Sequence, residues 1–223
     1  MDLPGLLPLA ESHQLCAFQN NIYIEDDFLG GIATSGSIGQ LGWNQYGGVI
    51  TSYVGIPDHP GVYQMYTTTA VGTNARLSLH RSDLVDPLRK IAFVWHIMPL
   101  ASTASATIRA GLGNSATEGV LDHGIYFEKL PTDSTWFCVT RSGGVQTRTD
   151  SGIEVSGKFT TLVMEKDEHG SRFYIDRVPV GRHTLNLPTV LVCPWISVRN
   201  SAAVNSIVLL DYFALKLEGI KRT

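Results

Sequence analysis

The stretch TWFCVTRSGGVQTRTDSGIEV (residues 135–155) indicates the fold most clearly. Two runs of alternating apolar and polar residues are separated by Ser-Gly-Gly at 142–144, a composition that tight turns favour. This pattern predicts a β-hairpin, and Asp-Ser-Gly at 150–152 predicts a second turn. The hairpin also carries Trp136 and two arginines that a hairpin does not need, and these side chains raise the question of a binding surface.

The same alternation recurs along most of the chain, whereas helical periodicity is nearly absent. The segment 90–99 has apolar residues on both faces, which predicts a central strand, and KDEHGS (166–171) predicts another hairpin turn. We therefore expect one all-β domain at 21–223, a two-sheet antiparallel jelly-roll sandwich, with an extended N-terminal arm at 1–20. Other alternating segments are GVYQMYTTT (61–69), ARLSLHR (75–81), GIYFEKL (124–130), FTTLVMEKD (159–167), PWISVRN (194–200) and SIVLLDYFALKLEG (206–219).

Composition excludes several classes of function. The net charge is -3 and the 17 basic residues are scattered, so no basic patch for nucleic acid is expected. The first 18 residues lack a basic region and contain two prolines, which argues against a signal peptide or a membrane span. The three cysteines, Cys16, Cys138 and Cys193, have no paired spacing and are expected to be buried thiols.

Several segments resemble virion proteins of tailed bacteriophages, in matching order from about residue 25 to 218. The resemblance implies a concanavalin-like jelly roll in a tail, fibre, baseplate or capsid-decoration protein, and it supplies no catalytic residues. It also implies a homo-oligomer such as a trimer, contacts with other virion proteins, and a place in the virion after synthesis in the host cytoplasm. The segments are EDDFLGGIATSGSIGQLGW (25–43), HPGVYQMYTTT (59–69), the 135–155 hairpin, FYIDRVPVGRHTLNLPT (173–189) and LLDYFALKLEG (209–219).

Enzymatic chemistry has weak support in the sequence. Glycoside hydrolysis needs two converging carboxylates, and the nearest string, EKDE at 165–168, coincides with a predicted hairpin tip. No G-x-S-x-G elbow or regular histidine spacing is present, and His96 is expected to be a core histidine. The acidic run at 25–27 suits either a cation or a charged strand start. We therefore predict no enzyme, catalytic residue, metal or cofactor.

Five side chains remain as candidates for a binding surface: Trp136, Tyr126, Tyr174, Arg141 and Arg148. Aromatic rings and planar arginine donors suit a protein interface, a glycan site, or the plain core of a sheet, and the sequence leaves all three open. The leading hypothesis is a non-enzymatic phage virion structural protein that acts by oligomeric assembly. The alternative is a carbohydrate-binding module that recognises host surface glycans.

Overall fold

The structure is a computed structural model that describes residues 21–29, 38–53, 56, 57, 59, 61–79, 85–114 and 121–219. The arm expected at 1–20 lies outside the described residues. The described part is almost entirely β-strand, with one short 3-10 turn at Ala101–Ser105. In these residues no helix has the length and apolar character needed to cross a membrane.

The strands form two sheets, and every pairing between named strands in the described part is antiparallel. The eight-stranded sheet runs β13 (Val178–His183), β12 (Gly170–Ile175), β11 (Thr160–Asp167), β6 (Lys90–Pro99), β15 (Ile207–Glu218), β4 (Tyr63–Tyr66) and β3 (Val49–Ser52), and β1 (Asn21–Asp26) pairs with β15. The seven-stranded sheet runs β10 (Val145–Glu154), β9 (Thr135–Ser142), β8 (Gly124–Lys129), β7 (Ala106–Gly113), β14 (Cys193–Asn200), β5 (Asn74–Ser78) and β2 (Asn44–Tyr46).

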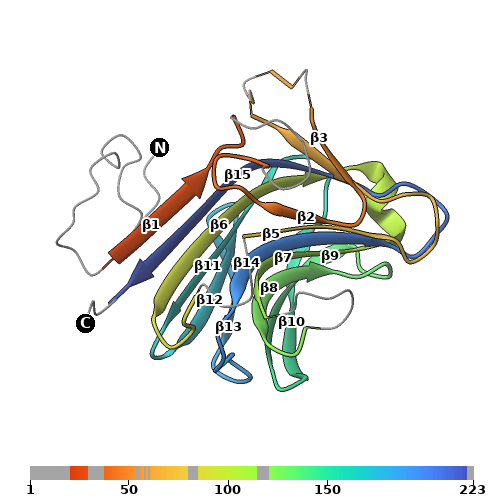
Figure 1. The fold of residues 1–223 in the computed structure, drawn as a ribbon. Helices are drawn as coiled ribbons and strands as arrows, with labels where there is room; N and C mark the ends of the chain where they lie inside the picture. Colours follow the sequence, from red (N-terminus) through yellow and green to blue (C-terminus); the bar gives the residue numbers. More distant parts are fainter. Residues whose placement is uncertain are drawn as a thin grey trace.

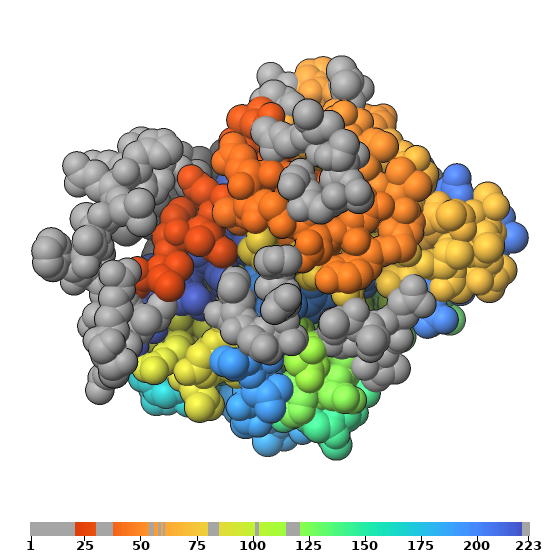
Figure 2. Space-filling view, in the orientation of Figure 1, coloured from red at the N-terminus to blue at the C-terminus, as the bar shows by residue number. Residues whose placement is uncertain are grey.

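The two sheets pack face to face around one large apolar core, which confirms the predicted jelly-roll sandwich (Figure 1). Strand β6 lies between β11 and β15, as its two apolar faces predict. In the core, the ring centroid of Trp43 lies 5.3 Å from that of Trp95 and 4.9 Å from that of Phe213. These large rings fill the space between the sheets and hold them together by burial. In the space-filling view, the orange segment that includes β2 and β3 forms the upper part of one face of the molecule (Figure 2).

The 135–155 hairpin forms as predicted at its first turn and differs at its second. Gly143 and Gly144 have φ of 57° and 80°, the conformation that a two-residue turn matching the twist of the strands requires. The turn predicted at 150–152 is wrong, because β10 continues through it to Glu154. The register instead shifts between Asp150 and Glu154, so the strand contains an irregularity rather than a reversal.

A turn that the sequence does not signal joins β12 to β13. Asp176 and Arg177 have φ of 47° and 71°, positive values that non-glycine residues seldom adopt. The N–H of Asp176 donates to the carbonyl of Thr161 at 2.9 Å, and its carboxylate accepts from the N–H of Thr161 at 2.8 Å. These two bonds offset the backbone strain, and Pro179 then lies in an edge strand, where its missing N–H is tolerated.

The carboxylate of Asp26, at the end of β1, is fully buried and ties Leu41 and Trp43 to that strand. Its Oδ1 accepts from the N–H of Phe28 at 2.8 Å. Its Oδ2 accepts from the N–H of Leu41 at 3.0 Å and from Nε1 of Trp43 at 2.9 Å. Gly39 has φ of 68°, and a Cβ there would lie 2.3 Å from Oδ2 of Asp26. The structure therefore assigns Asp26 to local folding, with three N–H donors on its two oxygens.

The cysteines that the structure describes follow the prediction. Cys138 and Cys193 are buried thiols, and Cys16 lies outside the described residues. Burial raises the pKa of the Cys138 thiol to about 12, so the thiolate is scarce at neutral pH.

A candidate functional site on the seven-stranded sheet

The outer face of the seven-stranded sheet carries a cluster of charged and aromatic side chains. On β8, Ile125 and Phe127 belong to the core, so the alternating residues Tyr126 and Glu128 point away from it. Antiparallel register places Arg109 of β7 directly opposite Glu128. Strands β7, β8, β9 and β10 therefore bring residues of distant sequence positions onto one surface.

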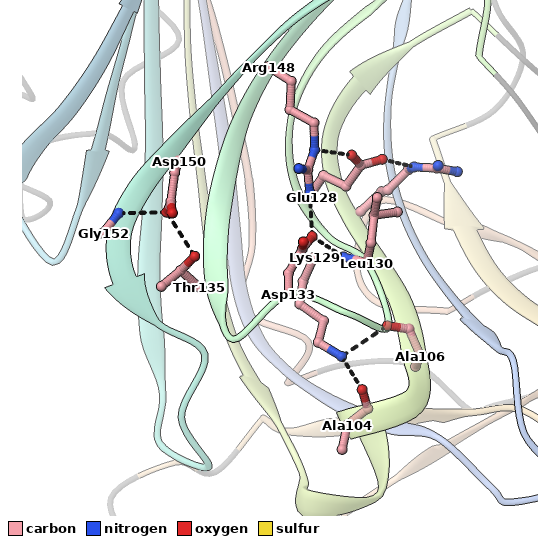
Figure 3. A network of polar contacts seen from close by, with 11 residues as sticks. Ala104, Ala106, Glu128, Lys129, Leu130, Asp133, Thr135, Arg148, Asp150 and Gly152 are labelled. Carbon is pink, nitrogen blue, oxygen red and sulfur yellow. Dashed lines mark hydrogen bonds and ion pairs between the residues drawn. The ribbon is translucent and has the colours of Figure 1, made fainter.

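Glu128 is the centre of an ionic network. Arg109 Nε lies 2.7 Å from one carboxylate oxygen of Glu128, and Arg148 Nε lies 2.9 Å from the other. Nη2 of Arg148 also contacts the carboxylate of Asp133, which accepts the N–H of Leu130 at 2.7 Å. Figure 3 shows Arg148 between the two carboxylates. One guanidinium thus holds Glu128 and Asp133 close together.

Burial within this network is uneven. The side chain of Glu128 is 3% exposed, whereas those of Arg109 and Arg148 are 21% and 20% exposed. The guanidinium carbon of Arg148 lies 3.4 Å from the ring centroid of the half-buried Phe137. The carboxylates of Glu128 and Asp133 and the ring of Phe137 fix the orientation of the Arg148 guanidinium. Arg109 and Arg148 both remain partly accessible to solvent.

An aromatic group lies next to the network. Tyr126 and Trp195 have ring centroids 6.0 Å apart and pack with Leu121 and Val139 in a small apolar cluster. Burial raises the pKa of the Tyr126 hydroxyl, with Glu128 adding to that effect. A Cβ at Gly113 would lie 2.4 Å from Nε1 of Trp195, so the backbone of β7 approaches this ring because residue 113 has no side chain.

The predicted binding residues divide among three places. Tyr126, Arg141 and Arg148 share the outer face of the seven-stranded sheet, and Nη1 of Arg141 donates to Gln146 at 3.0 Å. The ring of Tyr126 is only 1% exposed, so it packs among its neighbours on this face and cannot stack on a ligand as predicted. Trp136 is 0% exposed and lies in the core, so it cannot meet a glycan or a neighbouring protein. Tyr174 lies on the other sheet, where its hydroxyl donates to Glu165 at 3.2 Å.

Five residues of this face were missed by sequence reasoning. Alternation already separates Trp195 from the core residues Ile196 and Val198 of its strand. The link from Glu128 to its arginines depends on strand register, which no local pattern encodes. The missed residues are Arg109, Glu128, Asp133, Phe137 and Trp195.

Two other groups were weighed as chemical sites. The EKDE string was predicted to be a hairpin tip, but Glu165, Lys166 and Asp167 belong to β11, and only Glu168, with its side chain 63% exposed, lies in the turn. His96, expected in the core, instead lies on the outer face of β6 with its side chain 24% exposed. Among the described residues, His59, His96 and Asp211 form a group whose ligand atoms could hold a metal ion.

Comparison with known proteins supports the fold class. No protein-family model matches the sequence, and a search of the curated proteins finds no match. Among solved structures, a protein of unknown function from Shewanella oneidensis MR-1 has a TM-score of 0.66 and 13% identity, over 100% of this chain and 99% of that one. The carbohydrate recognition domain of Emp47p has a TM-score of 0.61 and 10% identity, over 88% of this chain and 95% of that one. A Bacillus licheniformis β-glucanase has a TM-score of 0.57 and 12% identity, over 90% and 98%.

These similarities place the chain in the concanavalin-like class of jelly-roll sandwiches. They contradict the prediction that the protein is not an enzyme, because several of the similar structures are glycoside hydrolases, among them β-1,3-glucanase and lichenase structures. The sequence prediction considered carboxylates within one strand, whereas in the structure Glu128 of β8 and Asp133 of the segment that follows it both contact Arg148. No phage virion protein is among the structures named here.

Proposed function

We propose that the protein is glycan-active and recognises a glycan on the outer face of the seven-stranded sheet. The observation that carries the proposal is the network of Arg109, Glu128, Arg148 and Asp133, with Phe137 beside it. Its arginines are fixed by buried carboxylates and partly exposed. Planar donors held in this way are prepared to bind sugar hydroxyl groups with little loss of side-chain freedom.

The comparisons support this proposal at the level of class. The similar structures include a carbohydrate recognition domain, β-glucanases and an endo-acting O-glycanase of gut bacteria. The candidate ligands are therefore β-1,3-glucans, mixed-linkage β-glucans and mucin-type O-glycans.

The first test is direct binding. A glycan array that includes these three classes is followed by calorimetric titration of any ligand found. We expect Arg141→Ala to weaken binding at least tenfold, since it removes a half-buried guanidinium of this face that makes no contact with Glu128 among the contacts shown. Arg172→Ala is the matched control, because Arg172 is a partly exposed arginine of the eight-stranded sheet. Equal binding by wild type and both variants would remove this face as the site, and absence of any binding would refute the proposal.

Hydrolysis is a second candidate function, and the shared contact of Glu128 and Asp133 with Arg148 favours it. Retaining glycosidases use two carboxyl groups about 5 Å apart. Contact with the same guanidinium keeps the carboxylates of Glu128 and Asp133 near each other. Release of reducing sugar from laminarin and mixed-linkage glucan measures the activity. We expect Glu128→Gln to abolish the hydrolysis while the fold is kept. If the wild type hydrolyses none of the glycans that it binds, hydrolysis is refuted and glycan binding is the function that remains.

We also propose, on the sequence resemblance alone, that the protein is a virion component that forms a homo-oligomer and contacts other virion proteins. A host surface glycan would then be its ligand, which makes this role compatible with the glycan site. Light scattering at several concentrations measures the oligomer. A closed oligomer such as a trimer supports the assembly role, and a monomer in both solution and purified particles argues against it.

A further inference from the structure

Two histidines and one aspartate converge on the eight-stranded sheet, on the opposite side of the sandwich from the proposed glycan face. His96 comes from β6, His59 precedes β4, and Asp211 comes from β15. One ligand atom from each lies within 4.8 Å of the other two. Because the neighbouring Trp95 and Ile97 point into the core, His96 points to the outer face of this sheet.

A β-bulge places Asp211 in this group. Leu210 pairs with Ile97 and Tyr212 pairs with His96, so Asp211 is the extra residue between two consecutive pairs. Such an extra residue bends the strand and redirects a side chain.

The distances among these atoms suit a small divalent cation. Nδ1 of His59 lies 2.8 Å from Oδ2 of Asp211, and Nε2 of His96 lies 3.7 Å from the same oxygen. A tetrahedral zinc ion holds nitrogen and oxygen ligands at about 2.0–2.2 Å, which places those ligand atoms about 3.3–3.6 Å from one another. The two separations lie on either side of this range, so a movement of the Asp211 side chain and the two rings would let all three share one ion.

Neighbouring side chains fix the positions of the two imidazole rings. Nδ1 of His96 is hydrogen-bonded to Oγ1 of Thr161 at 3.0 Å, which leaves Nε2 directed at Asp211. Phe159 stacks on both rings, with centroids 4.3 Å from His59 and 5.0 Å from His96. Metal-binding histidines in proteins have this kind of outer support on the second ring nitrogen.

The group is open to solvent on one side. The side chains of His59, His96 and Asp211 are 27%, 24% and 18% exposed, so an ion can enter and keep a water ligand. Asp176 lies near enough to act electrostatically on His96, which adds negative charge around the group. Asp211 and Asp176 thus favour a cation at this position.

We propose that His59, His96 and Asp211 bind a divalent transition-metal ion of the zinc class, with two imidazole nitrogens, one carboxylate oxygen and a water molecule as ligands. Imidazole nitrogen favours zinc and its neighbours over magnesium or calcium, which prefer oxygen ligands throughout. The three ligands come from segments distant in sequence, so the ion stabilises the folded state by binding it and not the unfolded chain.

The test uses Co²⁺ as a spectroscopic probe on chelator-treated full-length protein. We expect one equivalent of Co²⁺ to give visible absorption of a tetrahedral complex, Zn²⁺ to abolish that absorption, and Zn²⁺ to raise the melting temperature. His59→Gln and Asp211→Asn should each weaken Co²⁺ binding at least tenfold. Thr161→Val should weaken it about 10- to 100-fold, the usual effect of removing an outer-shell partner.

His169→Gln is the matched control. His169 also lies beside a carboxylate, Glu168, but the two side chains are 69% and 63% exposed at a hairpin tip. This variant should bind Co²⁺ as the wild type does. The proposal is overturned if the wild type binds no Co²⁺, or if His59→Gln and Asp211→Asn, shown to be folded by circular dichroism, bind it as tightly as the wild type.

Discussion

Replacing Asp26 by asparagine should destabilise the protein strongly although the two side chains have nearly the same shape. The carboxylate is fully buried and accepts from Phe28, Leu41 and Trp43. An amide has one oxygen, so at best it keeps the two bonds at the Oδ2 position and turns its NH₂ group toward the N–H of Phe28. Two donors then face each other in a fully buried site.

The magnitude follows from these three bonds. A hydrogen bond to a charged group contributes about 1.5–3 kcal/mol, and an unsatisfied buried donor costs about 1–3 kcal/mol. Loss of one such bond and weakening of the other two gives a decrease of about 2–4 kcal/mol in the free energy of unfolding. For a chain of this size, that decrease lowers the melting temperature by roughly 4–16 °C.

Urea unfolding and calorimetry measure this decrease, and Asp27→Asn is the matched control. The carboxylate of Asp27 accepts from Leu29 and Gln40 through a single oxygen, Oδ1, which an amide oxygen can replace. Asp27→Asn should therefore change the free energy of unfolding by about 0.5 kcal/mol or less. If Asp26→Asn destabilises the protein no more than Asp27→Asn does, the reasoning about the buried carboxylate is wrong.

Two further predictions concern buried titrating groups. Burial lowers the pKa of His183, whose ring nitrogens contact Thr140 at 3.1 Å and Thr149 at 3.0 Å. In the unfolded chain His183 takes up a proton near pH 6.5, whereas in the folded state it takes up that proton only at a lower pH. The contribution of neutral His183 to stability is therefore full above that pH and is lost as the pH falls. Between pH 8 and pH 5 the free energy of unfolding should decrease more steeply in the wild type than in His183→Gln. Parallel curves for the two proteins would count against this prediction. The pKa of the Cys138 thiol is raised to about 12, so iodoacetamide at pH 8 should not alkylate it in the folded protein. It should react after denaturation, and peptide mass mapping measures both results. Rapid labelling of the native protein would contradict the burial of Cys138.

Local patterns were sufficient for the strands and for most turns. Alternation of apolar residues identified the central strand β6, and the glycine pair at 143–144 identified the hairpin turn. The turn at 176–177 was missed because it has no glycine, and its strain is offset by Thr161, a partner 15 residues away. The bulge at Asp211 was missed for a similar reason, since its cause is the pairing of β15 with β6.

The candidate site was only partly predictable. Arg141, Arg148 and Tyr126 were predicted because arginines and a tyrosine stood out against alternating strands, and the structure places all three on one face of the seven-stranded sheet. Trp136 was assigned to the wrong face, because both faces of β9 contain bulky apolar residues and the sequence does not say which one meets the other sheet. Glu128 was overlooked, since its importance lies in two arginines that reach it from β7 and β10.

The most direct test of glycan recognition on the seven-stranded sheet is a ¹H–¹⁵N NMR titration that follows the arginine Nε–H signals. A β-1,3-glucan oligosaccharide, or whichever glycan the array identifies, is added to the wild-type protein. The account predicts that the signals of Arg109, Arg141 and Arg148 shift on binding, whereas that of Arg172 on the other sheet does not. Binding that leaves all three unchanged, or no binding of any glycan, would contradict it.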